Sequence, residues 1–256
     1  MDFQEFKDKA SDQIEIDLNS YKEKRVKRRT NNLMKKHNIE DYRQGYDKIR
    51  KNADFRQEFL QHMTINTTEF FRNKENYDYL QENILPKLFA NHNKVKIWSA
   101  ASSIGCEPYT MAIILNELNI DPSRYELLAT DIDPGALKKA KIGKYKPNTL
   151  KKTDDRIIHK YFSKQDDRYL IDPQIKKLVN FDTLNLLEDR YYSNINLILC
   201  RNVFIYFTKE IKKNLTKNLT NALSKNGILF LGNTEYLLQP GKYNLKKLHT
   251  SFYQKK

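Results

Sequence analysis

The chain of 256 residues is strongly basic, with 30% charged residues and a formal net charge of +14. Hydrophobic residues make up 39% and aromatic residues 12%, which excludes a largely disordered polypeptide and favours one or two packed domains. No apolar run approaches the about 20 residues that span a bilayer, and no signal-peptide pattern opens the chain, so we expect a cytoplasmic protein. The positive charge predicts a polyanionic partner: nucleic acid, an anionic membrane or an acidic protein surface.

Metal-ligating residues are few and scattered. The five histidines form no closely spaced pair, and the two cysteines, Cys106 and Cys200, lack the spacing of a zinc site. We therefore predict no metal site and expect Cys200 to be a small buried hydrophobic residue.

Helical patterns fill residues 1–85, which we assign to an N-terminal helical and basic domain. Within Tyr21–Lys36 a narrow apolar stripe that includes Val26 and Leu33 crosses a segment with eight cations and one acid, Glu23. Pro86 is expected to end or bend the last of these helices. The further helices are expected over Asn38–Arg50, Asp54–Met63 and Lys74–Leu85.

From residue 95 onward strand and helix patterns alternate, which predicts an α/β fold with a mainly parallel sheet. Residues 145–177 interrupt this alternation with polar turns and indicate a small inserted subdomain. The expected strands are Val95–Ser99, Tyr125–Thr130, Leu178–Phe181, Ile195–Cys200 and Gly227–Gly232, followed by a closing pair over Tyr243–Leu248 and Ser251–Gln254. The expected helices are Tyr109–Leu118, Pro134–Ala140 and Lys209–Leu223, the last with Thr208 as its N-cap.

Two strand ends carry the pattern of a nucleoside site. Ile97–Pro108 runs from a strand into a bend of small residues, and Leu127–Asp133 ends in carboxylates that suit ribose hydroxyls. A pyrophosphate-binding turn needs several glycines, but this bend contains only Gly105 and no Gly-Lys-Ser/Thr element follows. The pattern therefore favours a cofactor with adenosine and no phosphates, S-adenosylmethionine.

Two more segments add polar residues to apolar surroundings: Asn66–Arg72 (NTTEFFR) and Ile195–Phe207 (INLILCRNVFIYF). With them the chain closely resembles the chemotaxis receptor glutamate methyltransferases, in which five elements occur in a fixed order. Here these elements read Thr68–Arg72, Trp98–Thr110, Thr130–Asp133, Asn185–Leu187 and Cys200–Phe207. The chain departs from the family pattern at Ile104 and Cys106, where threonine and an acid are usual.

The resemblance implies a class I S-adenosylmethionine-dependent methyltransferase fold, Rossmann-like, with an antiparallel C-terminal strand. The N-terminal helical domain would cover residues 1–85 and the methyltransferase domain residues 86–256, with an antiparallel β subdomain inserted at about 145–177. The implied reaction transfers a methyl group from S-adenosylmethionine to glutamate side chains of bacterial chemoreceptors. Its products are glutamyl methyl esters and S-adenosylhomocysteine.

The resemblance also assigns roles to individual residues. Arg72 and Tyr206 would position the substrate carboxylate, and Asp131 would bind the ribose hydroxyls. Asp133 is expected to be a helix N-cap before Pro134 instead. The residues expected to bind the cofactor are Asn66, Thr68, Arg72, Glu107, Asp131, Asn185, Leu186, Arg201 and Asn202.

The partner implied is the acidic helical methylation region of membrane chemoreceptors, which Arg25, Arg28 and Arg29 of the basic helix would dock. Some family members also bind a C-terminal receptor pentapeptide through a glycine-containing loop of the β subdomain. The corresponding Ser163–Tyr169 is short and has no glycine, so we predict that this chain does not use the pentapeptide.

Two alternatives remain open from the sequence. A nucleic-acid methyltransferase would suit the net charge, but such enzymes typically carry an Asn/Asp-Pro-Pro-Tyr-type element where this chain has Arg201–Phe204 (RNVF). A receptor-binding adaptor without catalytic activity would be consistent with the departures at Ile104 and Cys106.

Overall fold

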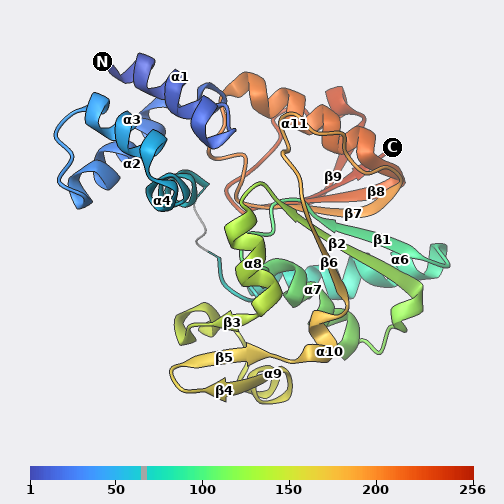
Figure 1. The fold of residues 1–256 in the computed structure, drawn as a ribbon. Coiled ribbons are helices and arrows are strands. Elements are labelled where there is room, and N and C mark those ends of the chain that lie inside the picture. The colour runs from blue at the N-terminus through green and yellow to red at the C-terminus, as the bar shows by residue number, and fades with distance from the viewer. Residues whose placement is uncertain (65–67) are drawn as a thin grey trace. The chain divides into compact units, whose positions relative to one another are not determined.

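The computed structural model describes residues 1–64 and 68–256, and the chain divides into two compact units (Figure 1). The helical unit comprises Met1–Asn66 and Phe204–Lys213, and the sheet unit comprises Thr67–Val203 and Asn214–Lys256. In the described residues, no helix combines the length and the apolar composition needed to cross a membrane.

The helical unit is built from amphipathic helices. Asp2 accepts a hydrogen bond from the Glu5 backbone N–H and so caps the first helix. In the core, the rings of Phe6 and Phe59 meet edge to face with their centroids 6.0 Å apart. The helices are α1 (Phe3–Ile14), η1 (Leu18–Ser20), α2 (Glu23–Lys36), α3 (Tyr42–Lys51) and α4 (Ala53–Thr64). Polar side chains cap the start of α1, η1 and α3.

A later segment of the chain, Phe204–Lys213, belongs to this helical unit. The Lys22 N–H donates to the Tyr206 carbonyl at 2.9 Å. The Thr208 hydroxyl accepts from the Ile211 N–H at 3.4 Å, so Thr208 caps helix α11 (Lys209–Ala222) as predicted. The segment that follows Cys200–Val203 is therefore hydrogen-bonded to the start of the basic helix α2.

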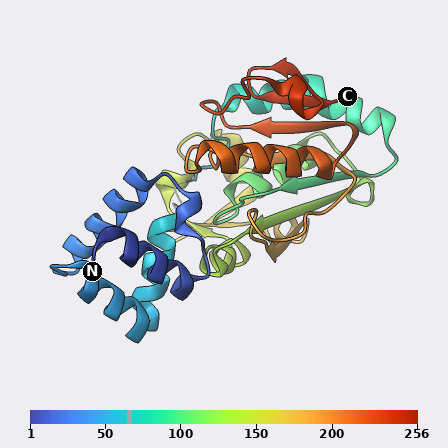
Figure 2. The same ribbon diagram turned by 90° about the horizontal axis from the view of Figure 1, so that it is seen from above.

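The sheet unit contains a seven-stranded sheet in the order β6-β2-β1-β7-β8-β10-β9. The pairs among β6, β2, β1, β7 and β8 are parallel, and β10 is antiparallel to both β8 and β9. Figure 2 shows the closing pair β9–β10, in red, at the edge of this sheet. The strands are β1 (Val95–Ser99), β2 (Tyr125–Asp131), β6 (Val179–Thr183), β7 (Ile195–Cys200), β8 (Leu223–Leu231), β9 (Leu245–His249) and β10 (Phe252–Lys255).

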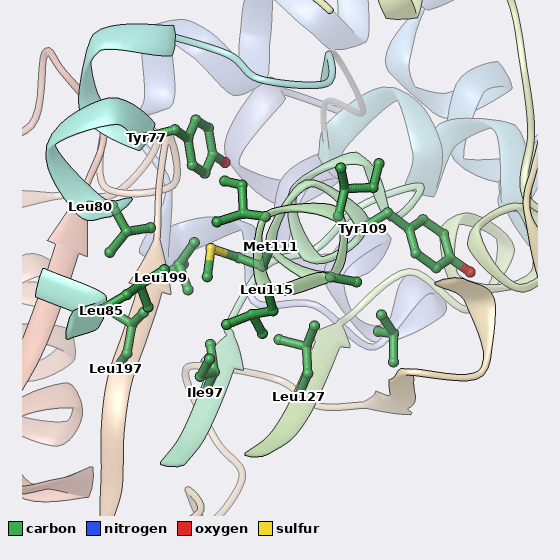
Figure 3. Packing of buried hydrophobic residues seen from close by; sticks show 14 of the residues in the cluster. Tyr77, Leu80, Leu85, Ile97, Tyr109, Met111, Leu115, Leu127, Leu197 and Leu199 are labelled. Carbon is green, nitrogen blue, oxygen red and sulfur yellow. The ribbon is translucent and has the colours of Figure 1, made fainter. Parts of the chain in front are cut away.

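Helix α7 (Cys106–Glu117) forms the centre of the hydrophobic core. Its Met111 and Leu115 are fully buried and lie between β1, β2 and the preceding helices, as Figure 3 shows. Further helices of this unit include α5 (Lys74–Tyr79), the π-helical turn η2 (Leu80–Ile84), α6 (Leu85–Asn91), η3 (Pro122–Arg124), α8 (Pro134–Ile142), η4 (Pro147–Leu150), α10 (Pro173–Lys176) and η5 (Pro240–Tyr243).

Pro86, expected to end or bend the helix Lys74–Leu85, does not end the helical segment, because the next helix, α6, begins at Leu85 and runs to Asn91. Pro86 lies in the first turn of α6, where a missing N–H costs little, and the π-helical turn η2 directly precedes that helix. This helical segment belongs to the sheet unit, since Tyr77 packs edge-on against Phe230 with ring centroids 5.8 Å apart. The domain boundary at residue 85 stays a prediction; the compact units divide between Asn66 and Thr67.

The expected inserted subdomain contains a three-stranded antiparallel sheet in the order β3-β5-β4. Phe70, from the NTTEFFR segment, packs edge-on against Tyr145 and Phe162 of this sheet, with ring centroids 4.9 and 5.0 Å away. Phe70 is therefore a core residue. The elements are β3 (Lys144–Tyr145), α9 (Asp155–Tyr161), β4 (Phe162–Gln165) and β5 (Arg168–Ile171).

Candidate functional site

The loop after β1 is attached to strands on both sides of β1. The Ala100 N–H donates to the Leu199 carbonyl of β7 at 2.8 Å, and the Ser102 N–H donates to the Thr130 carbonyl of β2 at 2.9 Å. Because β1, β2 and β7 are parallel, their carboxyl ends meet at this loop, the edge where nucleotide ligands bind in α/β sheets.

Asp131 ends β2 and is 8% exposed. Its Oδ2 accepts from the Ser103 N–H at 2.7 Å and its Oδ1 from the Asp133 N–H at 3.0 Å. Burial raises the pKa of Asp131 to about 6, so the carboxylate is mostly ionised at neutral pH and keeps lone pairs for a ligand. Asp133 accepts from the Gly135 N–H at 2.8 Å, which confirms it as the N-cap of α8.

Glu107 and Arg201 form a buried ion pair at the same edge. The distance from Arg201 Nη1 to Glu107 Oε2 is 3.4 Å, and the side chains are 3% and 12% exposed respectively. The Ser99 hydroxyl donates to the other Glu107 oxygen at 2.8 Å. Burial raises the pKa of Glu107, while the Arg201 charge and the Ser99 hydrogen bond oppose that shift and favour the carboxylate.

Arg201 also joins the strand end to the loop after the NTTEFFR segment. Its Nη1 donates to the Tyr77 hydroxyl at 3.0 Å, and its Nη2 donates to the Arg72 carbonyl at 2.8 Å and to Asn73 Oδ1 at 3.2 Å. The guanidinium lies 4.6 Å from the centre of the Phe230 ring. Tyr77 and Asn73 are not among the predicted site residues.

Two buried polar atoms at this edge lack a hydrogen-bond partner among the residues that the structure describes: Ser102 Oγ and Arg201 Nε. A buried hydroxyl or guanidinium N–H without a partner is costly, so a polar ligand at this edge is favoured. These donors and the Asp131 carboxylate fit a molecule that combines ribose hydroxyls with a charged amino-acid end. The set of side chains therefore fits S-adenosylmethionine.

Asn202 is held in a left-handed conformation, with φ +62°. Its N–H donates to Glu235 Oε2 at 2.7 Å, and the Gly232 N–H donates to the same oxygen at 2.9 Å. A Cβ on Gly232 would lie 2.9 Å from the Asn202 nitrogen, so glycine is required for this close approach. Glu235, which no sequence pattern singles out, thus joins the ends of β7 and β8.

We predict that Glu235→Ala lowers the free energy of unfolding by about 1–3 kcal/mol, because the buried Gly232 N–H and the partly buried Asn202 N–H lose their acceptor. It is also expected to weaken cofactor binding through the displaced Asn202 backbone. Urea unfolding and calorimetric titration test both effects, with the exposed Glu188→Ala as the matched control. Unchanged stability in both variants would contradict the positioning role of Glu235.

Asn185 and Leu186 follow β6, the neighbour of β2. The Leu184 N–H donates to the Asp131 carbonyl at 3.2 Å, which brings this segment beside the Asp131 strand end. Asn185 Oδ1 accepts from the Leu187 N–H at 3.0 Å, and Leu186 is buried. The structure therefore brings six predicted cofactor residues to one edge of the sheet: Glu107, Asp131, Asn185, Leu186, Arg201 and Asn202.

The NTTEFFR segment is only partly described, since Asn66 lies outside the described residues. Thr68 forms a side-chain hydrogen bond with Cys106, whose thiol is fully buried, and burial raises the pKa of that thiol well above its ordinary value. Cys106 is thus a packed residue that is poorly disposed to react. Arg72 is half-buried and contributes its carbonyl to Arg201.

Tyr206 and the basic helix lie in the helical unit. The Arg25 guanidinium lies over the Tyr206 ring at 5.3 Å, and both Arg25 and Arg29 are half-buried, whereas Arg28 is exposed. Burial lowers the pKa of Arg29, and the negative charge of an ionised Tyr206 would oppose that shift. Since Arg72 belongs to the sheet unit, its pairing with Tyr206 at the substrate stays a prediction.

Comparison with known proteins decides the family. Residues 66–252 match the family model described as CheR methyltransferase, SAM binding domain, and residues 1–64 match CheR methyltransferase, all-alpha domain. The chain belongs to the CheR methyltransferase family. This confirms the resemblance found in the sequence and the class I methyltransferase fold. It also confirms S-adenosylmethionine as the cofactor and methylation in chemotaxis as the function.

Relatives match over nearly the whole chain. The chemotaxis protein methyltransferase of Listeria monocytogenes is 36% identical over 241 residues, 94% of this chain and 92% of the relative. That of Borreliella burgdorferi is 30% identical over 94% of this chain and 89% of the relative. Chemotaxis protein methyltransferase 1 of Pseudomonas aeruginosa is 31% identical over 87% of this chain and 85% of the relative. The nucleic-acid methyltransferase alternative is not favoured.

Proposed function

We propose that this CheR family member transfers the methyl group of S-adenosylmethionine to glutamate side chains of bacterial chemoreceptors and so forms glutamyl methyl esters. The observation that carries the proposal is the set of family motif residues that meet at the carboxyl edge of the sheet, around the buried Glu107–Arg201 pair and Asp131. The relatives' names, which specify chemotaxis protein methyltransferases, support a receptor protein as the substrate.

S-adenosylmethionine, when bound, supplies a methyl group on a positively charged sulfur. Asp131 would accept hydrogen bonds from the ribose hydroxyls, and Glu107 would bind the charged amino-acid end. The other residues that would line the cofactor are Asn66, Thr68, Arg72, Asn185, Leu186, Arg201 and Asn202.

The substrate needs orientation and needs no general base. A glutamate side chain has a reference pKa of about 4.3, so it is already a carboxylate nucleophile at neutral pH. Arg72 presents a planar fork that matches a carboxylate, and the Tyr206 phenol can donate one hydrogen bond. These two side chains would align the carboxylate oxygen for attack on the methyl group.

The acidic helical methylation region of the receptor is the proposed partner of α2. Arg25, Arg28 and Arg29 are predicted to dock it, and among these Arg28 is exposed whereas Arg25 and Arg29 are half-buried. Arg28 is therefore the best placed of the three to meet an acidic surface, while Arg25 would act partly through Tyr206. The β4–β5 hairpin, with Asp166 at its turn, lacks the glycine-containing loop, so no pentapeptide tether is proposed.

We predict that Arg25→Ala and Tyr206→Phe have non-additive effects on kcat. A cation–π contact contributes about 0.5–2 kcal/mol, and here it would hold the ring that carries the Tyr206 hydroxyl. Arg25→Ala should therefore lower kcat by roughly 2- to 30-fold in the parent and by much less in Tyr206→Phe, which keeps the ring but lacks the hydroxyl. Arg28→Ala is the matched control and should raise KM for the receptor independently of Tyr206. Multiplicative effects of Arg25→Ala and Tyr206→Phe would show that Arg25 acts only through docking.

The experiment that tests the function uses methyl-labelled S-adenosylmethionine with receptor-bearing membranes, RNA and DNA in parallel reactions. The proposal predicts label in receptor bands that alkali releases as methanol. Label that enters only nucleic acid would contradict it. Measured cofactor binding without any transfer would favour the inactive adaptor.

A further inference from the structure

The positive charge of the chain is concentrated in two short segments. Residues 22–36 contain eight cations and one acid, and residues 134–153 contain seven lysines with neither an acid nor an arginine. Each segment therefore carries +7, and together they account for the whole net charge of +14; the remaining residues hold as many acids as cations. The first segment is the basic helix α2, whereas the second has no role in the function proposed above.

The second segment presents its lysines to solvent. They lie on α8, on β3 and on either side of η4, and Ile142 among them is 51% exposed. Lys151 forms a surface ion pair with Glu69 at 3.5 Å, whereas Lys138, Lys144 and Lys146 form no ion pair with any described residue. We call this group the lysine surface; its members, all exposed, are Lys138, Lys139, Lys141, Lys144, Lys146, Lys151 and Lys152.

The backbone below the lysine surface is fixed to the cofactor loop. The Tyr145 hydroxyl donates to the Ile104 carbonyl at 2.9 Å, and the Tyr109 hydroxyl donates to the Ala140 carbonyl at 2.9 Å. A Cβ on Gly105 would lie 2.9 Å from the Ala140 Cβ, so α8 packs as closely as glycine allows against this loop. These contacts hold the lysines on a rigid support beside the site.

The lysine surface also begins close to the candidate site. Helix α8 starts at Pro134, three residues after Asp131, and its nine residues extend about 13 Å at 1.5 Å per residue. A macromolecule that brings a carboxylate to the end of β2 must therefore approach these lysines to within about the length of α8.

We propose that the lysine surface is a second docking site for the acidic protein that is methylated, separate from the basic helix α2. The inference rests on the proposed function, because that function supplies an acidic protein substrate. An acidic helical surface complements the seven exposed lysines of residues 134–153, a stretch that itself contains no acid. Lysine ammonium groups on flexible stems make long-range, salt-sensitive contacts, so the surface steers the substrate and raises its association rate.

The test compares two triple charge reversals in the full chain. Lys138→Glu/Lys144→Glu/Lys146→Glu alters the lysine surface, and Lys242→Glu/Lys246→Glu/Lys247→Glu makes the same change in net charge at exposed lysines in and before β9. At low salt we expect the first variant to bind a soluble receptor cytoplasmic fragment at least about 10-fold more weakly than the second, with a flatter salt dependence. Circular dichroism and cofactor titration check that both variants are folded.

The outcomes separate this inference from the proposed function. Equal binding by both variants would overturn the docking site, even where methyl transfer to the receptor is observed. Receptor binding that only the first variant loses, without any methyl transfer by the parent, would uphold the docking site and contradict the proposed function. Binding to receptor-free vesicles of phosphatidylglycerol and phosphatidylethanolamine that only the first variant loses, with receptor binding unchanged, would assign the surface to a membrane and overturn the proposal.

Discussion

Replacing Arg201 with alanine is expected to lower the free energy of unfolding by about 3–5 kcal/mol, since it leaves a buried carboxylate without its countercharge. Among the residues that the structure describes, the Ser99 hydroxyl is the donor that remains to Glu107. The Tyr77 hydroxyl and the Arg72 carbonyl lose their partner in the same substitution. Cofactor binding should be lost as well, because Arg201 connects the NTTEFFR loop to the end of β7.

A second variant separates the ion pair from simple packing. Arg201→Met combined with Glu107→Gln removes both charges and keeps most of the volume, so it should recover much of the stability that Arg201→Ala loses. Urea unfolding followed by circular dichroism measures both differences. A loss below about 1 kcal/mol in Arg201→Ala would show that the buried pair is not what holds this edge together.

Asp131→Ala is expected to reduce the affinity for S-adenosylmethionine by roughly 10²- to 10⁴-fold, because two hydrogen bonds to ribose hydroxyls are lost. Hydrogen bonds to a charged group contribute about 1.5–3 kcal/mol each, and Asp131 is assigned the ribose hydroxyls. Asp167→Ala, at an exposed turn of the small sheet, is the matched control and should leave the affinity unchanged. Isothermal titration measures both, and equal affinities would contradict the assignment of Asp131.

The affinity for the cofactor should also fall as the pH drops through about 6. Burial raises the pKa of Asp131 to about 6, so below that pH the protonated carboxyl accepts hydrogen bonds poorly. The free energy of unfolding depends on pH in the opposite direction. Because the pKa of Asp131 is raised in the folded protein, its protonation stabilises the fold below the unfolded pKa of about 3.9, and this contribution is lost as the pH rises through 6. Titrations between about pH 5 and pH 8 should show this dependence in the parent, and Asp131→Asn should remove it.

The apolar strands are the most predictable part of the fold. The predicted strands Val95–Ser99 and Ile195–Cys200 have the same bounds as β1 and β7, because buried parallel strands read as continuous apolar runs. Strand β8 begins at Leu223, four residues before the prediction, because Ser224–Asn226 is polar and reads as a turn. Its pairing with β7 contains a register irregularity near Ile195, which no local pattern indicates.

The candidate site likewise contains residues that the sequence indicates and residues that only the structure reveals. Asp131, Glu107 and Arg201 lie in family motifs at strand ends, so the amino-acid sequence alone indicates them. Glu235 and Tyr77 lie outside those motifs, and their contacts join positions far apart in the chain. Long-range hydrogen bonds of this kind follow from the sheet order, which one sequence does not specify.

The measurement that tests the central claim most directly is the position of the transferred methyl group. Receptor protein incubated with this chain and S-adenosylmethionine would be digested at mildly acidic pH, and its peptides would be mapped by mass spectrometry. We predict methyl groups on glutamate side chains, lost on brief alkaline treatment and absent when Arg72→Ala replaces the parent. Base-stable methyl groups on lysine or arginine, or a receptor without methyl groups beside a methylated nucleic acid, would contradict the account.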